Sequence, residues 1–535
     1  MSPRPTIGGR IVSKRLRTIG LLAILVLGGS LRFAGLFWGQ GWGAHFTAGD
    51  EVLAYRVAVN YGLGDEQARY LGQPKFNRAS QLPGPLWTLF GFVSIRLWRF
   101  PQAIGFSMVL LNTFFIYLVY LLAKRILGIE YSLWAALFAA TQPWAIFYSV
   151  SAYNPEIMPA LGALLFLALW AVNQRPHSPA VFWVCFLLLI SPQIHLSGLL
   201  LLPAVLVLLM LSPQPVSKRW SLAGMAAGSA VYIPYLLGDM AHGWANTLHM
   251  AQGRSYFSLG ILKALAMPID LLIGWGGGLW GGRYAWDYLA MGDTYFGSRW
   301  IMIAFLALET ALVILFVIGF VKELRDALRG KWRSPMAAFR QAPALVFITV
   351  LLVIPILSFM LTRESYATRH GLIQLSVLLL LPSLFIVRRL PGVKWAGLLR
   401  GCIVLMVLFH CFLMVSFSLY RNRQIREGDQ FIPTFPNLEA VYQALRDHAG
   451  PNDRIQVEVG RFMKETPESA PGYSALILKP YVEAREREIH GLNSPDVLTR
   501  SYELRTLDSL PRDRSLVAYQ GHGIMLMIPA AGVAP

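Results

Sequence analysis

The chain has 535 residues, of which 55% are hydrophobic and only 14% are charged. This composition excludes a soluble globular domain, because too few polar side chains remain to cover its surface. The formal net charge of +18 (47 basic minus 29 acidic residues) would suggest nucleic-acid binding in a soluble protein. The three cysteines, Cys185, Cys402 and Cys411, lie in apolar segments and indicate neither a disulfide framework nor a metal site.

Long apolar segments divide the first 420 residues. A transmembrane helix needs roughly 20 apolar residues, and the sequence predicts about eleven such helices. The first segment begins with basic residues and continues as an apolar run without a small-residue cleavage site. This pattern predicts a retained transmembrane helix and not a signal peptide. The fifth and sixth flank Pro192 and are alternatively one long broken helix. The predicted spans cover residues 18–38, 102–122, 131–149, 156–173, 179–192, 196–211, 221–238, 299–320, 342–361, 371–387 and 395–418.

The basic residues predict the orientation of these spans. Cytoplasmic loops of membrane proteins carry an excess of Lys and Arg. With the N-terminus in the cytoplasm, every major basic cluster falls on the cytoplasmic side. The charge is therefore a topology signal, no nucleic-acid partner is expected, and the predicted location is the inner (cytoplasmic) membrane of a bacterial cell, crossed many times. These clusters are Arg10–Arg17, Lys124-Arg125, Arg175, Lys218-Arg219, Lys322–Arg340 and Arg388–Lys394.

The opposite, extracytoplasmic side receives the longer polar segments. They include a first outer loop at 39–101 and a long outer loop at 239–298. Within the first loop, residues 82–98 are apolar but open with Pro-Gly-Pro. Counting them as a span would break the charge alternation, so an interfacial or half-inserted helix is predicted there.

The polar tail from 421 to 535 is predicted to be a separate extracytoplasmic domain that follows the membrane domain of residues 1–420. Residues 437–448 have a helical pattern, 455–459 alternate as a strand, and 524–528 form a late apolar run. This mixture predicts a small α/β domain.

Two adjacent carboxylates, Asp50 and Glu51, follow the first span. A carboxylate at a membrane boundary is costly unless it is paired or used, which makes these residues functional candidates. The alternative is structural: Asp50 would cap a helix over 51–61, and the helix dipole would favour Glu51. The two interpretations are compatible.

Five short motifs occur in one order along the first 200 residues. They are Leu31-Arg32-Phe33, Gly49-Asp50-Glu51 with Tyr55, Leu82-Pro83-Gly84-Pro85-Leu86-Trp87, Lys124-Arg125-Ile126-Leu127-Gly128 and Ser151-Ala152-Tyr153-Asn154-Pro155-Glu156. In order and membrane side they resemble the GT-C superfamily of membrane glycosyltransferases. The resemblance is closest to the branch that contains protein O-mannosyltransferases and the lipid A aminoarabinose transferase.

The resemblance implies an enzyme that transfers a sugar from a polyprenyl-phosphate carrier to a hydroxyl of a lipid, glycan or protein acceptor. Asp50 occupies the position of the family's general base, with Glu51 beside it and Tyr55 on the substrate side. One displacement with one carboxylate base would invert the anomeric centre. The leaving phosphate is already anionic and needs positive charge nearby.

The chain departs from this branch at two positions. The family has a Lys where this chain has Leu82, so phosphate binding is assigned to Lys75, Arg78, Arg363 and Arg369. The family's later loop carboxylate aligns with Asn154, and Glu156 is its expected substitute or else a charge at a helix start.

Residues 362–370 form the densest polar cluster between two spans. An Arg-rich outer segment runs against the positive-inside rule, which favours anion binding over an Arg363–Glu364 surface pair. Tyr366 and His370 are added to the substrate site here, because the segment is similar to the family's Arg-aromatic signature. His195 is expected either at this site or as a hydrogen-bonded packing residue.

Two other functions also fit parts of the sequence. Glu309 lies mid-span, where it would be buried against an Arg or shared with water, and it favours a secondary transporter or a flippase. A ligase of lipid-linked glycans is chemically close to the transferase. No phosphate-binding loop and no Asp-x-Asp pair occur, so a lipid-linked donor is expected, without a metal or other cofactor.

Overall fold

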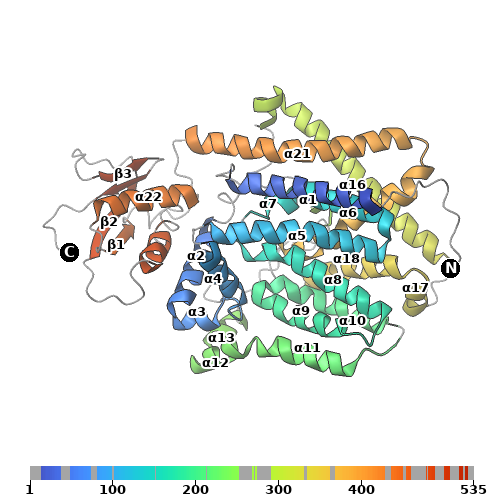
Figure 1. Ribbon diagram of the computed structural model, residues 1–535, viewed down its shortest axis with the longest axis horizontal. Helices are drawn as coiled ribbons and strands as arrows, with labels where there is room; N and C mark the ends of the chain where they lie inside the picture. Colours follow the sequence, from blue (N-terminus) through green and yellow to red (C-terminus); the bar gives the residue numbers. More distant parts are fainter. Residues whose placement is uncertain are drawn as a thin grey trace.

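The computed structural model describes residues 14–37, 48–73, 81–98, 102–150, 152–212, 214–251, 268–269, 271–273, 291–329, 334–361, 368–427, 435–449, 454–459, 478, 480–488, 499–506, 517–521 and 524–527. Most of them are helical and lie side by side as an elongated bundle, with a small α/β tail at one end (Figure 1).

Seven helical segments among the described residues are long and apolar enough to cross a membrane, or eight if one bent pair is a single span. Each predicted span overlaps a helix. The long segments are α1 (Lys14–Phe37), α5 (Ala103–Ile126), η1 with α8 (Asn154–Ile157 and Met158–Gln174), α16 (Arg299–Leu328), α18 (Pro343–Leu361), the run from η3 to η5 (Thr368–Gly392) and α21 (Ala396–Glu427); the bent pair is α11 (Lys218–Ala230) with α12 (Ile233–Ala241).

The remaining apolar helices are shorter. The predicted span at 131–149 is divided into α6 (Ile129–Thr141) and α7 (Pro143–Phe147). Pro143 cannot donate a backbone N–H and ends the first helix, while the Gln142 side chain accepts a hydrogen bond from the Ala145 N–H at 2.7 Å and caps the second. The other short elements are α9 (Ala180–Ile194), η2 (Leu196–Leu201) and α10 (Leu202–Met210).

Arg32 joins α1 to the end of α6. Its side chain is fully buried, and its guanidinium donates to the Ala139 and Ala140 carbonyls at 2.9 and 3.2 Å. The last carbonyls of a helix lack intrahelical partners and carry partial negative charge. A buried cation at this position therefore satisfies the carbonyls exposed by the break before Pro143.

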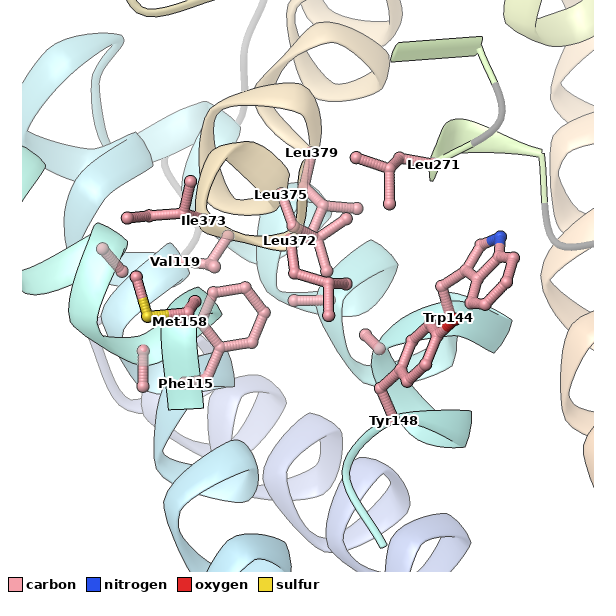
Figure 2. Packing of buried hydrophobic residues seen from close by; sticks show 14 of the residues in the cluster. Phe115, Val119, Trp144, Tyr148, Met158, Leu271, Leu372, Ile373, Leu375 and Leu379 are labelled. Carbon is pink, nitrogen blue, oxygen red and sulfur yellow. The ribbon is translucent and has the colours of Figure 1, made fainter. Parts of the chain in front are cut away.

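The core lies where α5, α7 and α8 meet η3 and α19 (Leu375–Leu378). Side chains from all five elements fill it (Figure 2). Gly162 of α8 lets η3 approach closely, because a Cβ there would lie 2.2 Å from the Ile373 carbonyl oxygen. The buried residues drawn and labelled there are Phe115, Val119, Trp144, Tyr148, Met158, Leu271, Leu372, Ile373, Leu375 and Leu379.

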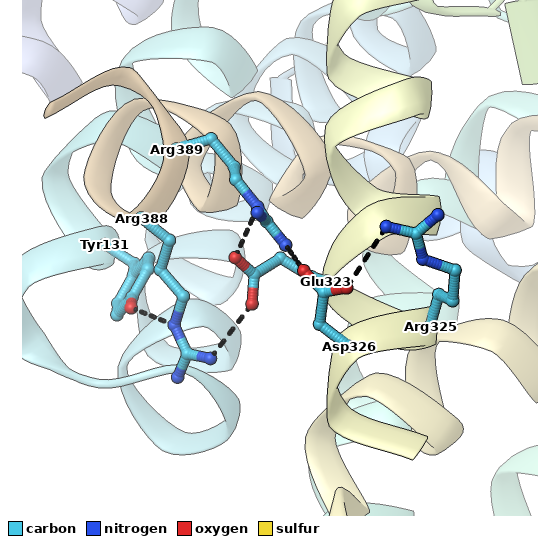
Figure 3. A network of polar contacts seen from close by, with 6 residues as sticks. All are labelled: Tyr131, Glu323, Arg325, Asp326, Arg388 and Arg389. Carbon is cyan, nitrogen blue, oxygen red and sulfur yellow. Dashed lines mark hydrogen bonds and ion pairs between the residues drawn. The ribbon is translucent and has the colours of Figure 1, made fainter. Parts of the chain in front are cut away.

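One end of the bundle is held by a charged network. Arg389 of η4 (Phe385–Arg389) pairs with Glu323 at 2.6 Å and with Asp326 at 2.8 Å (Figure 3). Arg388 donates to the Tyr131 hydroxyl at 2.9 Å, which ties the turn between α5 and α6 to the same end. α16 leads from here to α17 (Pro335–Gln341). The basic clusters around 124, 322–329 and 388 thus share one end.

The opposite end carries the helices of the first outer loop. These are α2 (Ala48–Leu63), α3 (Glu66–Tyr70) and α4 (Leu86–Trp98), beside α12 and α13 (Ala245–Ala251) (Figure 1). With 13 residues, α4 is too short to span a bilayer. It buries one face, including Trp87, against its neighbours and leaves Val93 and Leu97 exposed.

The tail contains α22 (Phe435–His448) and a four-stranded sheet in the order β1-β2-β4-β3. β1 (Arg454–Val459) pairs parallel with β2 (Thr499–Thr506), while β4 (Ile524–Met527) is antiparallel to β2 and to β3 (Val517–Gly521). Residues 480–488 form a further helix. Its buried Glu486 accepts from the Tyr442 hydroxyl at 2.7 Å and the Ile455 N–H at 2.7 Å, which joins α22, β1 and this helix.

Candidate functional site

Asp50 and Glu51 lie in the first turn of α2, where the helix dipole favours negative charge. Their side chains lie outside the described residues, so their contacts are not assigned. Positions four apart share a face of a helix, which places position 50 on the face of Ala54 and Ala58. That face packs on α4, because a Cβ at Gly91 would lie 3.0 Å from Ala58.

Position 51 lies on the face of Tyr55, and this second face of α2 contacts the tail. The Tyr55 hydroxyl donates to Glu488 at 2.6 Å, and its ring stacks on Tyr481 with centroids 5.8 Å apart. Burial and the neighbouring Glu488 carboxylate raise the pKa of Tyr55, so it remains a neutral donor. These contacts give Tyr55 a role in joining α2 to the tail and do not indicate the predicted contact with substrate.

Two polar pairs extend the interface between α2 and the tail. Arg56 pairs with Glu483 at 3.2 Å, and Arg487 donates to the Asn60 side chain at 2.9 Å. The helix at 480–488 therefore contacts two successive turns of α2, the helix that carries Asp50.

The Pro-Gly-Pro motif forms a turn at the start of α4. Leu82 exchanges backbone hydrogen bonds with Gly72 and Gln73, which brings the turn back toward α3. The indole of Trp87 donates to the Gln73 side chain at 2.7 Å. Gly84 has a φ of +128°, a conformation that side chains disfavour, and it lies directly against Gln193 of α9.

Asn154 joins η1 to the end of α9. Its side chain is buried and donates to the Ile194 carbonyl at 2.7 Å. The buried Glu156 accepts at its main-chain carbonyl from Asn112 at 3.1 Å. The two residues thus lie on a fixed element between α5 and α9.

Three 3₁₀ helices meet near this element. η3 packs against both η1 and η2. His195 precedes η2 and accepts from the Ser197 N–H at 3.2 Å, which is a capping interaction of the kind expected for a packing residue. Gln374 anchors η3 by donating to the Leu351 carbonyl at 2.6 Å. Arg369 and His370 belong to η3, the element that packs against the η1 helix of Asn154 and Glu156.

The remaining predicted site residues lie outside the described part of the chain. These are Lys75, Arg78, Arg363 and Tyr366. The side chains of Arg369 and His370 are likewise not described, so a joint phosphate site stays a prediction. Among the described residues, no group of three or more His, Cys, Asp and Glu side chains is arranged to hold a metal ion.

The first outer loop is also joined to the beginning of the long outer loop. Asn246 accepts from the Gln81 N–H at 2.7 Å and donates back to its carbonyl at 3.2 Å. The buried Asp239 accepts from the Asn246 N–H at 2.9 Å and so fixes this turn. Tyr70 stacks on His242. The sequence does not predict the contacts between the two loops. Gln81 and Asn246 are 165 positions apart, and no sequence pattern links residues at such a distance.

Glu309 has a partner that differs from the expectation. Instead of an Arg, the buried His410 of α21 lies against it, with Nε2 and Oε1 2.6 Å apart. Each residue lies within an apolar helix, so only their meeting in space identifies the pair.

No protein-family model matches the chain, and no curated protein matches it in a sequence comparison. Solved structures do. ArnT from Cupriavidus metallidurans bound to undecaprenyl phosphate is similar with a TM-score of 0.54 at 12% identity, over 98% of this chain and 100% of that chain. The same protein in the apo state has a TM-score of 0.55 at 12% identity, over 97% and 99% of the two chains.

ArnT is a lipid A aminoarabinose transferase of the GT-C class. The similarity extends over nearly the whole of both chains, so the present chain has the GT-C fold of polytopic membrane proteins. The predicted class of polytopic α-helical membrane protein is thereby confirmed, whereas the count of eleven spans and the extracytoplasmic C-terminal domain stay predictions.

Proposed function

We propose that the chain is an integral membrane glycosyltransferase that moves a sugar from a polyprenyl-phosphate donor to an acceptor hydroxyl. The observation that carries this proposal is the fold shared with ArnT, including the structure of ArnT bound to undecaprenyl phosphate. The carboxylates at the start of α2 and the convergence of η1, η2 and η3 at the same end of the bundle support it further. The acceptor is a lipid, glycan or protein at the membrane.

Asp50 is the general base of this reaction. Its position in the first turn of α2 favours the ionised carboxylate, the form that accepts a proton. The acceptor hydroxyl gives its proton to Asp50 as its oxygen attacks the anomeric carbon of the sugar. The bond from that carbon to the phosphate oxygen breaks, and the polyprenyl phosphate leaves with the electron pair. This single displacement inverts the anomeric centre, and Glu51 adds negative charge beside the base.

The leaving phosphate is bound by basic residues that the chain supplies in place of the Lys missing at Leu82. Arg369 is the best supported of these, because η3 packs on the element that carries Asn154 and Glu156. Arg363, Lys75 and Arg78 complete the proposed phosphate set. His370, Tyr366, Asn154 and Glu156 face the sugar or the acceptor.

The reaction takes place on the extracytoplasmic side of a cytoplasmic membrane. Supporting this orientation, the basic clusters lie at one end of the bundle, and α2, α4 and the tail lie at the other. By the positive-inside rule the first end is cytoplasmic, as is the N-terminus. The tail is then an extracytoplasmic domain.

Glu309 was the main argument for a transporter. Its contact with the buried His410 gives it a structural role between α16 and α21, which leaves the transferase as the better supported function.

The test uses purified protein with a labelled polyprenyl-phosphate sugar and a mixture of lipid, glycan and peptide acceptors. The expected result is release of polyprenyl phosphate together with transfer of label to one acceptor class. Movement of the intact donor across vesicles, without cleavage of its sugar–phosphate bond, would instead establish a flippase.

A further inference from the structure

Gln193 places a fully buried amide against the Pro-Gly-Pro turn. A Cβ at Gly84 would lie 2.4 Å from Cδ and Oε1 of Gln193 and 2.9 Å from its Nε2. The left-handed φ of Gly84 and this contact both require glycine, which lets the turn pack directly on the amide.

Neither Nε2 nor Oε1 of Gln193 has a hydrogen-bond partner among the residues that the structure describes. A buried donor or acceptor without a hydrogen-bond partner destabilises the folded protein. Other buried glutamines of the chain are paired: Gln142 donates to the Leu271 carbonyl and accepts from Ala145, and Gln374 donates to the Leu351 carbonyl. Gln193 thus differs from the other buried glutamines among the described residues.

The backbone around Gln193 is held on both sides. Asn154 donates to the Ile194 carbonyl at 2.7 Å, and the Tyr232 hydroxyl donates to the Leu189 carbonyl at 2.8 Å. These contacts fix the end of α9 in a position where the amide has no partner among the described residues. The amide is therefore held in place beneath the Gly84 turn, where a partner reaches it only when that turn moves.

We propose that Gln193 binds a hydroxyl group of the sugar substrate, an inference that rests on the transferase function above. A primary amide offers a donor and an acceptor, which matches a hydroxyl that also donates and accepts. It carries no charge, so it suits the neutral sugar and not the phosphate. The hydroxyl belongs either to the donor sugar or to a glycan acceptor. The Gly84 turn covers the amide, and binding therefore displaces that turn and couples the first outer loop to sugar recognition.

The test compares Gln193→Met with Gln142→Met, two replacements of a buried glutamine by an apolar side chain of similar shape. Thermal unfolding is measured in detergent, and Gln193→Met is expected to unfold at the same or a higher temperature than the wild type. Gln142→Met is expected to unfold at a lower temperature, because it leaves paired groups without partners. Equal losses of thermal stability in the two variants would overturn the inference, since the amide would then be paired in the resting protein.

Kinetics supply the second measurement. Gln193→Met is expected to raise the KM for a sugar substrate about tenfold or more, the effect of removing a hydrogen bond at a site built for a hydroxyl. A change in donor hydrolysis without acceptor assigns the hydroxyl to the donor, and a change only in the acceptor KM assigns it to a glycan acceptor. Unchanged kinetics beside an active wild type would overturn this inference alone. A wild type that transfers no sugar would overturn the proposed function, and this inference with it.

Discussion

The hydroxyl of Tyr55 donates a 2.6 Å hydrogen bond to Glu488, a residue 433 positions later in the chain. The bond joins the helix that carries Asp50 to the C-terminal tail. Because Arg56 and Asn60 make further contacts with the same tail helix, the tail holds the middle of α2 between residues 55 and 60.

Replacing Tyr55 by Phe is expected to reduce sugar transfer by several-fold to about tenfold while the protein stays folded. The lost bond to a charged acceptor contributes about 1.5 kcal/mol, at the lower end of the usual range because Glu488 is 36% exposed. Transfer rate and thermal unfolding are measured together. Tyr442→Phe is the matched control, since it removes a bond to Glu486 within the tail and should lower tail stability with less effect on transfer. An unchanged rate in Tyr55→Phe would refute a role of the tail in holding α2.

Arg32→Met is expected to destabilise the membrane domain by about 2–4 kcal/mol, since it leaves the buried carbonyls of Ala139 and Ala140 without a donor. Thermal unfolding in detergent measures the loss. Arg15→Met, at an exposed position of the same helix, serves as the control and should unfold like the wild type. Equal unfolding temperatures for both variants would mean that Arg32 does not support the break between α6 and α7.

Glu309→Gln keeps a hydrogen-bonding group opposite His410 and should leave sugar transfer within about twofold of the wild type. Glu309→Leu should lower thermal stability, because His410 then loses this partner inside an apolar helix pair. Transfer and solute uptake are measured on both variants. Abolished uptake of a solute in Glu309→Gln would revive the transporter interpretation.

The tail should lose stability at acidic pH. Burial alone raises the pKa of Glu439, but hydrogen bonds from Tyr481 and Gln443 and the charge of Arg485 outweigh it, so the pKa lies below its usual value. A carboxylate with a depressed folded-state pKa stabilises the fold fully above its unfolded pKa of about 4.3 and stops doing so as pH falls through the folded pKa. Unfolding of the tail monitored between pH 6 and about pH 3 should show this loss. In Glu439→Gln this contribution should be absent, and a pH dependence identical to the wild type would contradict the assignment.

Much of the fold could be predicted from the sequence. Polar groups are costly in lipid, so long apolar segments indicate the membrane spans, and the basic clusters indicate their orientation. The division at Gln142 and Pro143 was missed although the proline was visible, because the apolar pattern continues across it. Contacts such as Tyr55 with Glu488, or Glu309 with His410, arise only when distant elements meet. Gln193, whose amide has no partner among the described residues, was not assigned as a site residue for the same reason: hydrogen-bond satisfaction is a property of the packed structure.

The most direct test of the proposed mechanism is the rate of sugar transfer from a labelled polyprenyl-phosphate donor by Asp50→Asn, compared with Glu51→Gln and the wild type. Loss of the general base should reduce the turnover of Asp50→Asn by about 10²–10⁴-fold with unchanged thermal unfolding, whereas Glu51→Gln should lose less. Wild-type turnover in a folded Asp50→Asn protein would contradict the account.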